Sequence, residues 1–520
     1  MENKLEDSIR NLNNRKILFL IVIGAVIIRL LFTPFNLPLS TDAFSYFIYA
    51  VLINRELVFP HQFIFSNFGL SVFLSPFFGD SINMKMLELM NIQRIFCIII
   101  SSLSVIPIFY FLKEFFKDKI SILVSVLFVF NPILITNSIL GLTDTLFQFF
   151  IILSLAVFFY NQKKYFFISF IFISLASFIR YEGLFLLVPF FIGSYLFRNK
   201  IYDFNKKLIY GIILFSIIFI ITNFIGYSDN EQFTIIQPFI QSISYFSRSV
   251  VMEIPDDDDL IYNENVENGL TIFIINSSTS FVKNIFLILI PSAIFFTFIG
   301  ATKLIKTKIT SEKIFFLILF LFMNLSVFYA YGRGIEDPRY LLGSLPIFSL
   351  LSCITINKFP IFKKRKVVTI FVIFVIFSST IFMIIKNNDG LYYEEIYFGT
   401  KILAEQAKGV NIYDGAKFVK IAEQDLQWPI LLNPGDDNRV GMNIKKFSYE
   451  NFDEPLDFII HNKDKGLTHL FVIKNEDEGF FDKLYYDNEN YPFLELVFDS
   501  KKNFMTHEFK IFKINFDKME

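Results

Sequence analysis

Long apolar runs separated by short charged segments dominate the chain from residue 17 to residue 385. The runs 17–31 and 367–385, for example, contain almost no charged residue. About 20 helical residues cross a hydrocarbon core about 30 Å thick, whereas the strands of a membrane barrel alternate between apolar and polar positions. The pattern therefore predicts a polytopic α-helical membrane protein with about eleven transmembrane helices. We expect these spans at 17–35, 93–112, 120–139, 145–160, 165–179, 184–197, 208–226, 282–302, 314–330, 340–357 and 367–385.

The composition excludes a wholly soluble protein. Of the 520 residues, 54% are hydrophobic and 19% are charged, whereas an ordinary soluble domain has about 25% charged residues. The two cysteines, Cys97 and Cys353, both fall within apolar runs, where cysteine behaves as a small hydrophobic residue. They therefore indicate neither a disulfide framework nor a zinc site.

Lysine and arginine residues divide the loops into two sets. Alternate loops, starting with the N-terminal segment, carry 22 basic residues, and the loops between them carry six. Basic residues accumulate in the short loops on the cytoplasmic side of a membrane. We therefore expect a cell-membrane protein with a cytoplasmic N-terminus and, after eleven spans, residues 387–520 outside. The first apolar run has no small-residue cleavage site, which indicates a retained anchor.

Charge and pattern both change near residue 387. Residues 387–520 carry a formal charge of −9, and the rest of the chain carries +8. Short β-rich runs there alternate with polar helical stretches, and the last two runs are expected to form a hairpin. We predict a transmembrane domain at 1–386 and a soluble extracytoplasmic mixed α/β domain at 387–520. Within the first domain, the long loop 36–92 is expected to carry helices that lie in the membrane interface.

Few charged residues lie in the loops expected outside. Asp42 follows the first span, Asp144 opens a later helix, and Arg180 and Glu182 lie at the junction of two apolar helices. A charge at the bilayer centre costs at least about 2.5–3.5 kcal/mol, so we expect these residues at the interface or in a wet cavity. The two aspartates would also suit helix caps, and Arg180 with Glu182 would suit an interfacial ion pair. Their placement on one side of the membrane is what a single active site requires.

Another outer loop is dense in charge. Arg333, Glu336, Asp337, Arg339 and Tyr340 lie within eight residues between two apolar helices. This density indicates a functional site, although a pair of salt bridges within the loop would also explain it.

An acidic run lies in the long loop that follows residue 226. It consists of Asp256, Asp257, Asp258 and Asp259. Four consecutive carboxylates could bind a hard cation through oxygen atoms, or they could simply form a solvated, self-repelling segment. We treat them as weak candidates for a metal site.

Four short features of the outer loops form a recognisable set. They are Asp42 soon after the first span, and the segments LTDTLF, FIRYEG and RYLLGSLP. Together they resemble the GT-C superfamily of integral-membrane glycosyltransferases. The resemblance covers roughly residues 15–385. Within the superfamily it is strongest to the glycosyltransferase family 39-like branch, which contains the dolichyl-phosphate-mannose-protein mannosyltransferases and the lipid A aminoarabinose transferases. Ala43 follows Asp42 where the protein mannosyltransferases have an Asp-Glu pair, so the acceptor stays open.

The resemblance implies transfer of a hexose or pentose from a polyprenyl-phosphate-linked donor to a hydroxyl group of a protein, lipid or glycan. It implies that Asp42 is the general base of an inverting displacement. Arginine binds phosphate well through its planar guanidinium, so the donor phosphate would be bound by Arg180 and Arg339, with Arg333 as a weaker third. The groups that orient these arginines or the acceptor would be Asp144, Glu182 and Tyr340.

This scheme requires no cofactor, since arginines could neutralise the leaving phosphate. The acidic run 256–259 nevertheless leaves room for a divalent cation. The expected partners are the lipid-linked sugar donor, the hydroxyl acceptor and the lipid bilayer, and no nucleic acid.

Two other functions stay open. A multi-pass transporter or lipid flippase would commonly show internal repeats, interrupted helices and charges within the spans. We find no repeat, and the outer charges lie at one face. An oligosaccharide ligase or polymerase would use a larger donor, which the sequence does not distinguish.

Overall fold

The structure is a computed structural model in which the chain forms two compact units. The first comprises residues 1–33, 45–79 and 92–383, and the second comprises residues 34–44, 80–91 and 384–520. The structure describes residues 2–39, 41–56, 68–79, 86–163, 165–225, 269–289, 293–406, 411–414, 454–463, 467–474, 482–486, 490–503 and 505–519.

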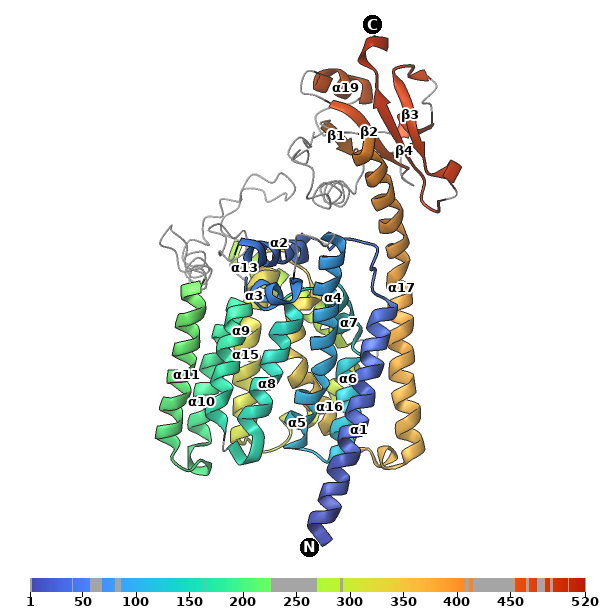
Figure 1. Ribbon diagram of the computed structural model, residues 1–520. Coiled ribbons are helices and arrows are strands. Elements are labelled where there is room, and N and C mark those ends of the chain that lie inside the picture. The colour runs from blue at the N-terminus through green and yellow to red at the C-terminus, as the bar shows by residue number, and fades with distance from the viewer. Residues whose placement is uncertain are drawn as a thin grey trace. The chain divides into compact units, whose positions relative to one another are not determined.

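The first unit is a bundle of apolar helices (Figure 1). Three helices pass from one unit into the other: α2 (Thr41–Glu56), α4 (Met86–Leu103) and α17 (Arg365–Gln406). The predicted domain boundary at 386 therefore falls inside one continuous helix. The other helices of the bundle are α1 (Glu2–Leu31), α3 (Gly69–Leu74), η1 (Ser75–Phe78), α5 (Val105–Lys113), α6 (Asp118–Val129), α7 (Pro132–Ile139), α8 (Asp144–Lys163), η2 (Phe166–Ile168), α9 (Ser169–Ile179), η3 (Tyr181–Leu186), α10 (Leu187–Leu196), η4 (Arg198–Lys200), α11 (Phe204–Ile225), α13 (Gly269–Leu289), α14 (Ile294–Ile305), α15 (Ser311–Gly332), η6 (Pro338–Ser344), α16 (Leu345–Lys358) and η7 (Pro360–Lys363).

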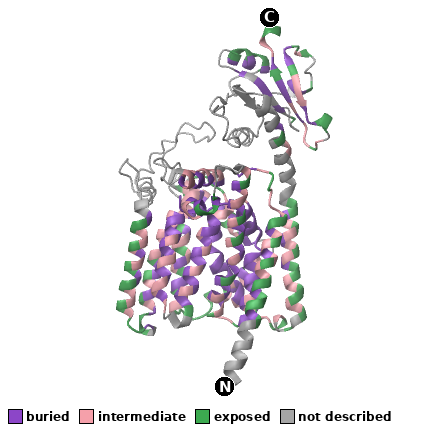
Figure 2. Ribbon diagram, viewed as in Figure 1, coloured by how far each residue is buried: buried purple, intermediate pink, exposed green. Residues whose placement is uncertain are grey.

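Several helices have the length and composition of membrane spans. Among the described residues, five helices are long and apolar enough to cross a bilayer, or up to seven if each bent pair is one span. Shorter apolar helices cover much of 144–196. The prediction of eleven spans thus stays a prediction. The outward faces of α11 and α17 expose large apolar side chains such as Ile220 and Phe377 (Figure 2), which is the surface that lipid tails would cover.

Proline divides one predicted span into two helices. The span expected at 120–139 consists of α6 and α7, which meet at an angle of 52°. Pro132 begins α7 and lacks the N–H that a continuous helix would need. Asn131 caps α7, since its side chain accepts a hydrogen bond from the Leu134 N–H at 3.2 Å, and its amide donates to the Ile288 carbonyl at 2.6 Å. The local sequence therefore places the break at Pro132, and the hydrogen bond to Ile288 joins it to a helix distant in the sequence.

Phenylalanine rings pack together at one end of α8. Phe158 stacks on Phe315 of α15 with ring centroids 5.2 Å apart, and Phe159 stacks on Phe316 at 5.5 Å. Phe158 lies 14 positions along α8 from Asp144, which corresponds to about 21 Å at 1.5 Å per residue. This aromatic core therefore holds α8 against α15 far from the end of α8 at which Asp144 lies.

The second unit contains a four-stranded sheet with the order β1-β2-β4-β3. β1 (Asn411–Asp414) pairs parallel with β2 (Leu467–Ile473), and β4 (Phe509–Ile514) pairs antiparallel with β2 and with β3 (Leu494–Asp499). The β3–β4 pair confirms the predicted terminal hairpin. One face of the sheet packs Leu470, Leu494 and Phe512 with residues of α19 (Pro455–Lys463). Phe509 and Ile511 of β4 are also fully buried, so the other face of the sheet is covered in part as well. Shorter elements are α20 (Asp482–Tyr486), η10 (Lys501–Asn503) and η11 (Phe516–Lys518).

Candidate functional site

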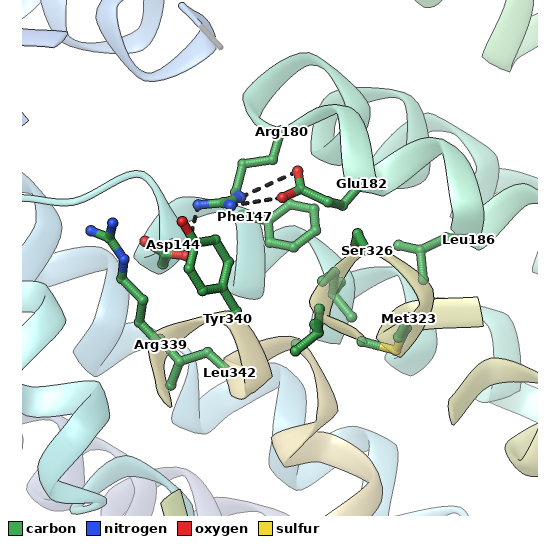
Figure 3. A pocket seen from close by; sticks show the side chains of 13 residues that line it. Asp144, Phe147, Arg180, Glu182, Leu186, Met323, Ser326, Arg339, Tyr340 and Leu342 are labelled. Atoms are coloured by element: carbon green, nitrogen blue, oxygen red, sulfur yellow. Dashed lines mark hydrogen bonds and ion pairs between the residues drawn. The ribbon is translucent and has the colours of Figure 1, made fainter. Parts of the chain in front are cut away.

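A pocket lies in the first unit where the start of α8, the α9–η3 junction, α15 and η6 meet (Figure 3). Its cavity volume is about 20 Å³, room for little more than one water molecule. The predicted residues Asp144, Arg180, Glu182, Arg339 and Tyr340 all line it. The other lining residues are Phe147, Ile151, Leu186, Met323, Ser326, Val327, Leu342 and Gly343.

A tight loop delivers Asp144 to the pocket. After α7 the chain turns at Gly141, whose φ of 75° lies in the left-handed region that favours glycine. The Gln93 side chain of α4 donates a hydrogen bond to the Gly141 carbonyl at 2.8 Å and so anchors this turn. Asp144 then begins α8, where the helix dipole favours a negative charge.

Arg180 lies between α9 and η3 in an extended backbone conformation, with φ −146° and ψ 132°. The chain folds back on itself here, and a side chain at Gly183 would collide with the backbone of Ser177. The guanidinium of Arg180 contacts two carboxylates: Nη1 lies 2.9 Å from Asp144 Oδ1, and Nη2 lies 2.7 Å from Glu182 Oε1. Its Nε donates a further hydrogen bond to Glu182 Oε2 at 3.3 Å.

This trio is buried. Arg180 is 9% exposed and Asp144 is 4% exposed. Asp144 Oδ2 is buried too and accepts no hydrogen bond from any residue that the structure describes. The Arg180 guanidinium therefore pairs with two carboxylates in a poorly solvated site, where charge–charge interactions are stronger than in water.

Tyr340 lies between the two arginines of the pocket (Figure 3). Its ring centroid is 5.4 Å from Cζ of Arg180 and 5.5 Å from Cζ of Arg339, both within cation–π range. Asp337 holds Arg339 in place: its Oδ1 accepts a hydrogen bond from the Arg339 backbone N–H at 2.8 Å, and its Oδ2 lies 3.1 Å from Nε. The loop therefore presents a second cation beside the first.

A buried amide joins η6 to α8. Gln148, fully buried one turn after Asp144, donates from Nε2 to the Leu342 carbonyl of η6 at 2.9 Å. This bond holds the segment of Arg339 and Tyr340 against the helix that begins with Asp144. The spacing of the charged groups is thus set by packed helices rather than by a loose loop.

The structure does not bring every predicted residue to this pocket. Arg333 ends α15 as an exposed residue near the Tyr329 ring and does not line the pocket. Glu336 binds Lys283 and Ser280, and these hydrogen bonds lower the pKa of its carboxyl.

Asp42 is half-buried in the first turn of α2 and belongs to the second unit. Tyr46, four residues later and hence on the same face of that helix, is buried in the first unit. The acidic run 256–259 lies outside the described residues. Within the described part of the chain, no group of three or more His, Cys, Asp or Glu could hold a metal ion.

Sequence reasoning missed several buried polar residues. Arg29 is fully buried in α1 and donates to Ser101, Ser138 and two backbone carbonyls, and Arg94 of α4 is 2% exposed. Both lie inside predicted spans, and a single arginine within an apolar run is the sequence feature that could have identified them as buried polar residues. Gln148 and Ser326 had no such signal, because single amides and hydroxyls are ordinary in membrane helices.

The family comparison matches part of the chain. Residues 88–225 match the family model described as dolichyl-phosphate-mannose-protein mannosyltransferase. This segment includes Asp144, Arg180 and Glu182. Comparison with curated protein sequences finds no match.

Solved structures share the fold at low sequence identity. An Archaeoglobus fulgidus oligosaccharyltransferase in the apo form matches with a TM-score of 0.52 and 10% identity, covering 88% of this chain and 69% of that chain. ArnT from Cupriavidus metallidurans, bound to undecaprenyl phosphate, matches with a TM-score of 0.51 and 8% identity, covering 95% of this chain and 97% of that chain.

The two comparisons agree with the sequence analysis. The family match over residues 88–225 and the fold shared with these solved structures bear out the resemblance to the mannosyltransferase branch that the sequence predicts.

Proposed function

We propose that the protein transfers a sugar from a polyprenyl-phosphate-linked donor to a hydroxyl acceptor on the outer face of the membrane. The observation that carries this proposal is the pocket in which Arg180 and Arg339 lie beside Asp144 and Glu182 at the ends of apolar helices. A lipid-linked donor needs a cationic site at the boundary of hydrocarbon and water. The undecaprenyl phosphate bound to the similarly folded ArnT supports such a donor.

Arg339 is the main ligand of the donor phosphate in this proposal. Arg180 already makes three hydrogen bonds to the carboxylates of Asp144 and Glu182, so a phosphate there would meet two negative neighbours. Arg339 lines the pocket, and its Nε lies 3.1 Å from Oδ2 of Asp337. Arg180 then holds Asp144 and Glu182 in place, whereas Arg333 has at most a peripheral role because it does not line the pocket.

Asp42 is the proposed general base. It would remove the acceptor proton while the acceptor oxygen attacks the anomeric carbon from the side opposite the phosphate, which inverts that carbon. A positioned base contributes about 10²–10⁴-fold to such a step.

The topology proposed from the loop charges completes this assignment. The N-terminus is cytoplasmic, and residues 387–520 lie outside, on the catalytic side, where they could dock the acceptor. The arginines neutralise the leaving phosphate, so we propose that no metal cofactor is required.

The decisive experiment uses purified full-length protein in lipid nanodiscs with a panel of labelled polyprenyl-phosphate sugars and hydroxyl acceptors. We expect transfer from at least one donor, retained in a chelator. Asp42→Asn should reduce turnover by at least about 100-fold while leaving insertion and expression unchanged. Wild-type turnover in purified Asp42→Asn protein would refute the base. Donor movement across vesicles without any glycosylated product would favour a flippase instead.

A further inference from the structure

We propose that the part of the pocket around Ser326 and Glu182 binds the sugar of the donor, and that Ser326 is a specificity-determining residue. This inference rests on the proposed function, since it takes the donor phosphate to lie at Arg339. It adds the location of the sugar and the residue that recognises it.

The Ser326 hydroxyl differs from most serine hydroxyls in the bundle helices in that it lines the pocket and makes no hydrogen bond to a described residue. Serine in a membrane helix commonly donates to the carbonyl four residues earlier, and many serines here do so: Ser125, Ser177, Ser194, Ser277 and Ser378. Ser326 lines the pocket from α15 and makes no hydrogen bond to any residue that the structure describes. A hydroxyl in a lining position with its bonding capacity unused is available to a ligand.

The surroundings of Ser326 suit a sugar. Glu182 offers carboxylate oxygens that accept hydrogen bonds, and Ser326 can both donate and accept. Leu186, Met323 and Val327 supply apolar surface in the same pocket. A pyranose has hydroxyl groups at its rim and C–H groups on its faces, so it needs this mixture of polar and apolar contacts.

The position of this region also fits the donor. In Figure 3 Ser326, Leu186 and Met323 lie on one side of the pocket, and Arg339 and Asp144 lie on the other. A phosphate bound at Arg339 carries the sugar on one of its own oxygens, so the sugar must lie next to the phosphate and inside the same pocket.

Other parts of the donor fit this region less well. The phosphate would meet the carboxylate of Glu182, whose charge repels it. The hydrocarbon tail would bury the Ser326 hydroxyl without a hydrogen bond, and an unsatisfied buried hydroxyl costs about 1–3 kcal/mol. The sugar is the part of the donor that satisfies both groups.

The pocket must widen to admit a sugar. Its cavity of about 20 Å³ is walled by Leu186 and Val327, and Met323 is the flexible side chain best able to move.

The test combines variants of the full-length protein with donors that lack one hydroxyl group. Ser326→Ala is compared with wild type, using the parent polyprenyl-phosphate sugar and its 2-, 3-, 4- and 6-deoxy analogues. Ser378→Ala is the matched control, because Ser378 lies on α17 outside the pocket and donates to the Phe374 carbonyl. Binding of sugar-free polyprenyl phosphate is measured with the same proteins.

We expect Ser326→Ala to lower kcat/KM for the parent donor by about 3- to 10-fold, the value of one neutral hydrogen bond. With the wild type, one deoxy donor should show the same loss of kcat/KM. With Ser326→Ala, that donor should show no further loss, as expected when the missing hydroxyl and Ser326 bond to each other. Affinity for sugar-free polyprenyl phosphate should change less than 2-fold, and Ser378→Ala should behave as wild type.

Two results would overturn the inference. One is equal discrimination among the deoxy donors by wild type and Ser326→Ala, and the other is an equal loss of affinity for sugar-bearing and sugar-free lipid. Failure of the proposed function itself is a different result: wild type then transfers no sugar from any donor, and its affinity for sugar-bearing lipid does not exceed that for the sugar-free lipid.

Discussion

Tyr340 separates two cations, and its replacement tests whether their spacing matters. The ring lies 5.4 Å from Cζ of Arg180 and 5.5 Å from Cζ of Arg339. The two guanidinium carbons are therefore at most about 11 Å apart. Asp144, Glu182 and Asp337 neutralise the two cations locally, so the ring acts through its two cation–π contacts, each of which contributes about 0.5–1 kcal/mol.

We therefore expect Tyr340→Leu to lose about 1–2 kcal/mol of donor-phosphate recognition, or about 5- to 30-fold in kcat/KM. Tyr340→Phe keeps the ring and is the matched control. Its kcat/KM should stay within about 3-fold of wild type, because the Tyr340 hydroxyl makes no hydrogen bond to a described residue. Donor kinetics in nanodiscs and binding of sugar-free polyprenyl phosphate measure both variants. Equal losses in Tyr340→Leu and Tyr340→Phe would show that the hydroxyl, rather than the ring, is what matters.

Three further predictions follow from other contacts. Arg339→Ala should raise the KM for the lipid donor by at least about 10-fold, whereas Arg333→Ala, outside the pocket, should change it less than about 3-fold; similar kinetics for the two variants would contradict the phosphate assignment. Gln148→Met, which removes the bond to the Leu342 carbonyl, should lower kcat more than it changes donor KM, and an unchanged kcat would show that this bond does not position η6. Burial lowers the pKa of His469 to about 4, whereas an unfolded histidine titrates near 6.5. The free energy of unfolding should therefore fall by up to about 3 kcal/mol as the pH drops from 6.5 to 4. In urea titrations, His469→Gln should remove this pH dependence.

Helix positions were largely predictable because they depend on local composition. An apolar run partitions into lipid wherever it occurs in a chain, and helices satisfy its backbone hydrogen bonds internally. The predicted span 367–385 accordingly lies within α17, and the span 314–330 lies within α15. The terminal hairpin was equally local, since β3 and β4 are adjacent in the sequence.

Bends and extensions were less predictable. α6 and α7 form one apolar run, and Pro132 marked the break, yet the angle between them depends on how Asn131 packs against Ile288. The 42-residue length of α17 also exceeds the apolar run that predicted it. The helix continues through the Asn-Asn-Asp-Gly segment at residues 387–390, whose low helix propensity predicts an end there.

By itself, the sequence determined that this protein lives in a membrane, that its scarce outer charges are candidates for chemistry, and which family it resembles. Only the tertiary structure decided which of those charges meet. Asp144 and Arg180 are 36 positions apart and Arg339 is far beyond both, yet helix packing brings them into one pocket and leaves Arg333 outside it. The physical reason is that hydrophobic burial acts on each segment locally, whereas the convergence of side chains depends on packing between helices distant in sequence. That packing also turned Ser326, an ordinary helix serine in the sequence, into a lining residue of the site.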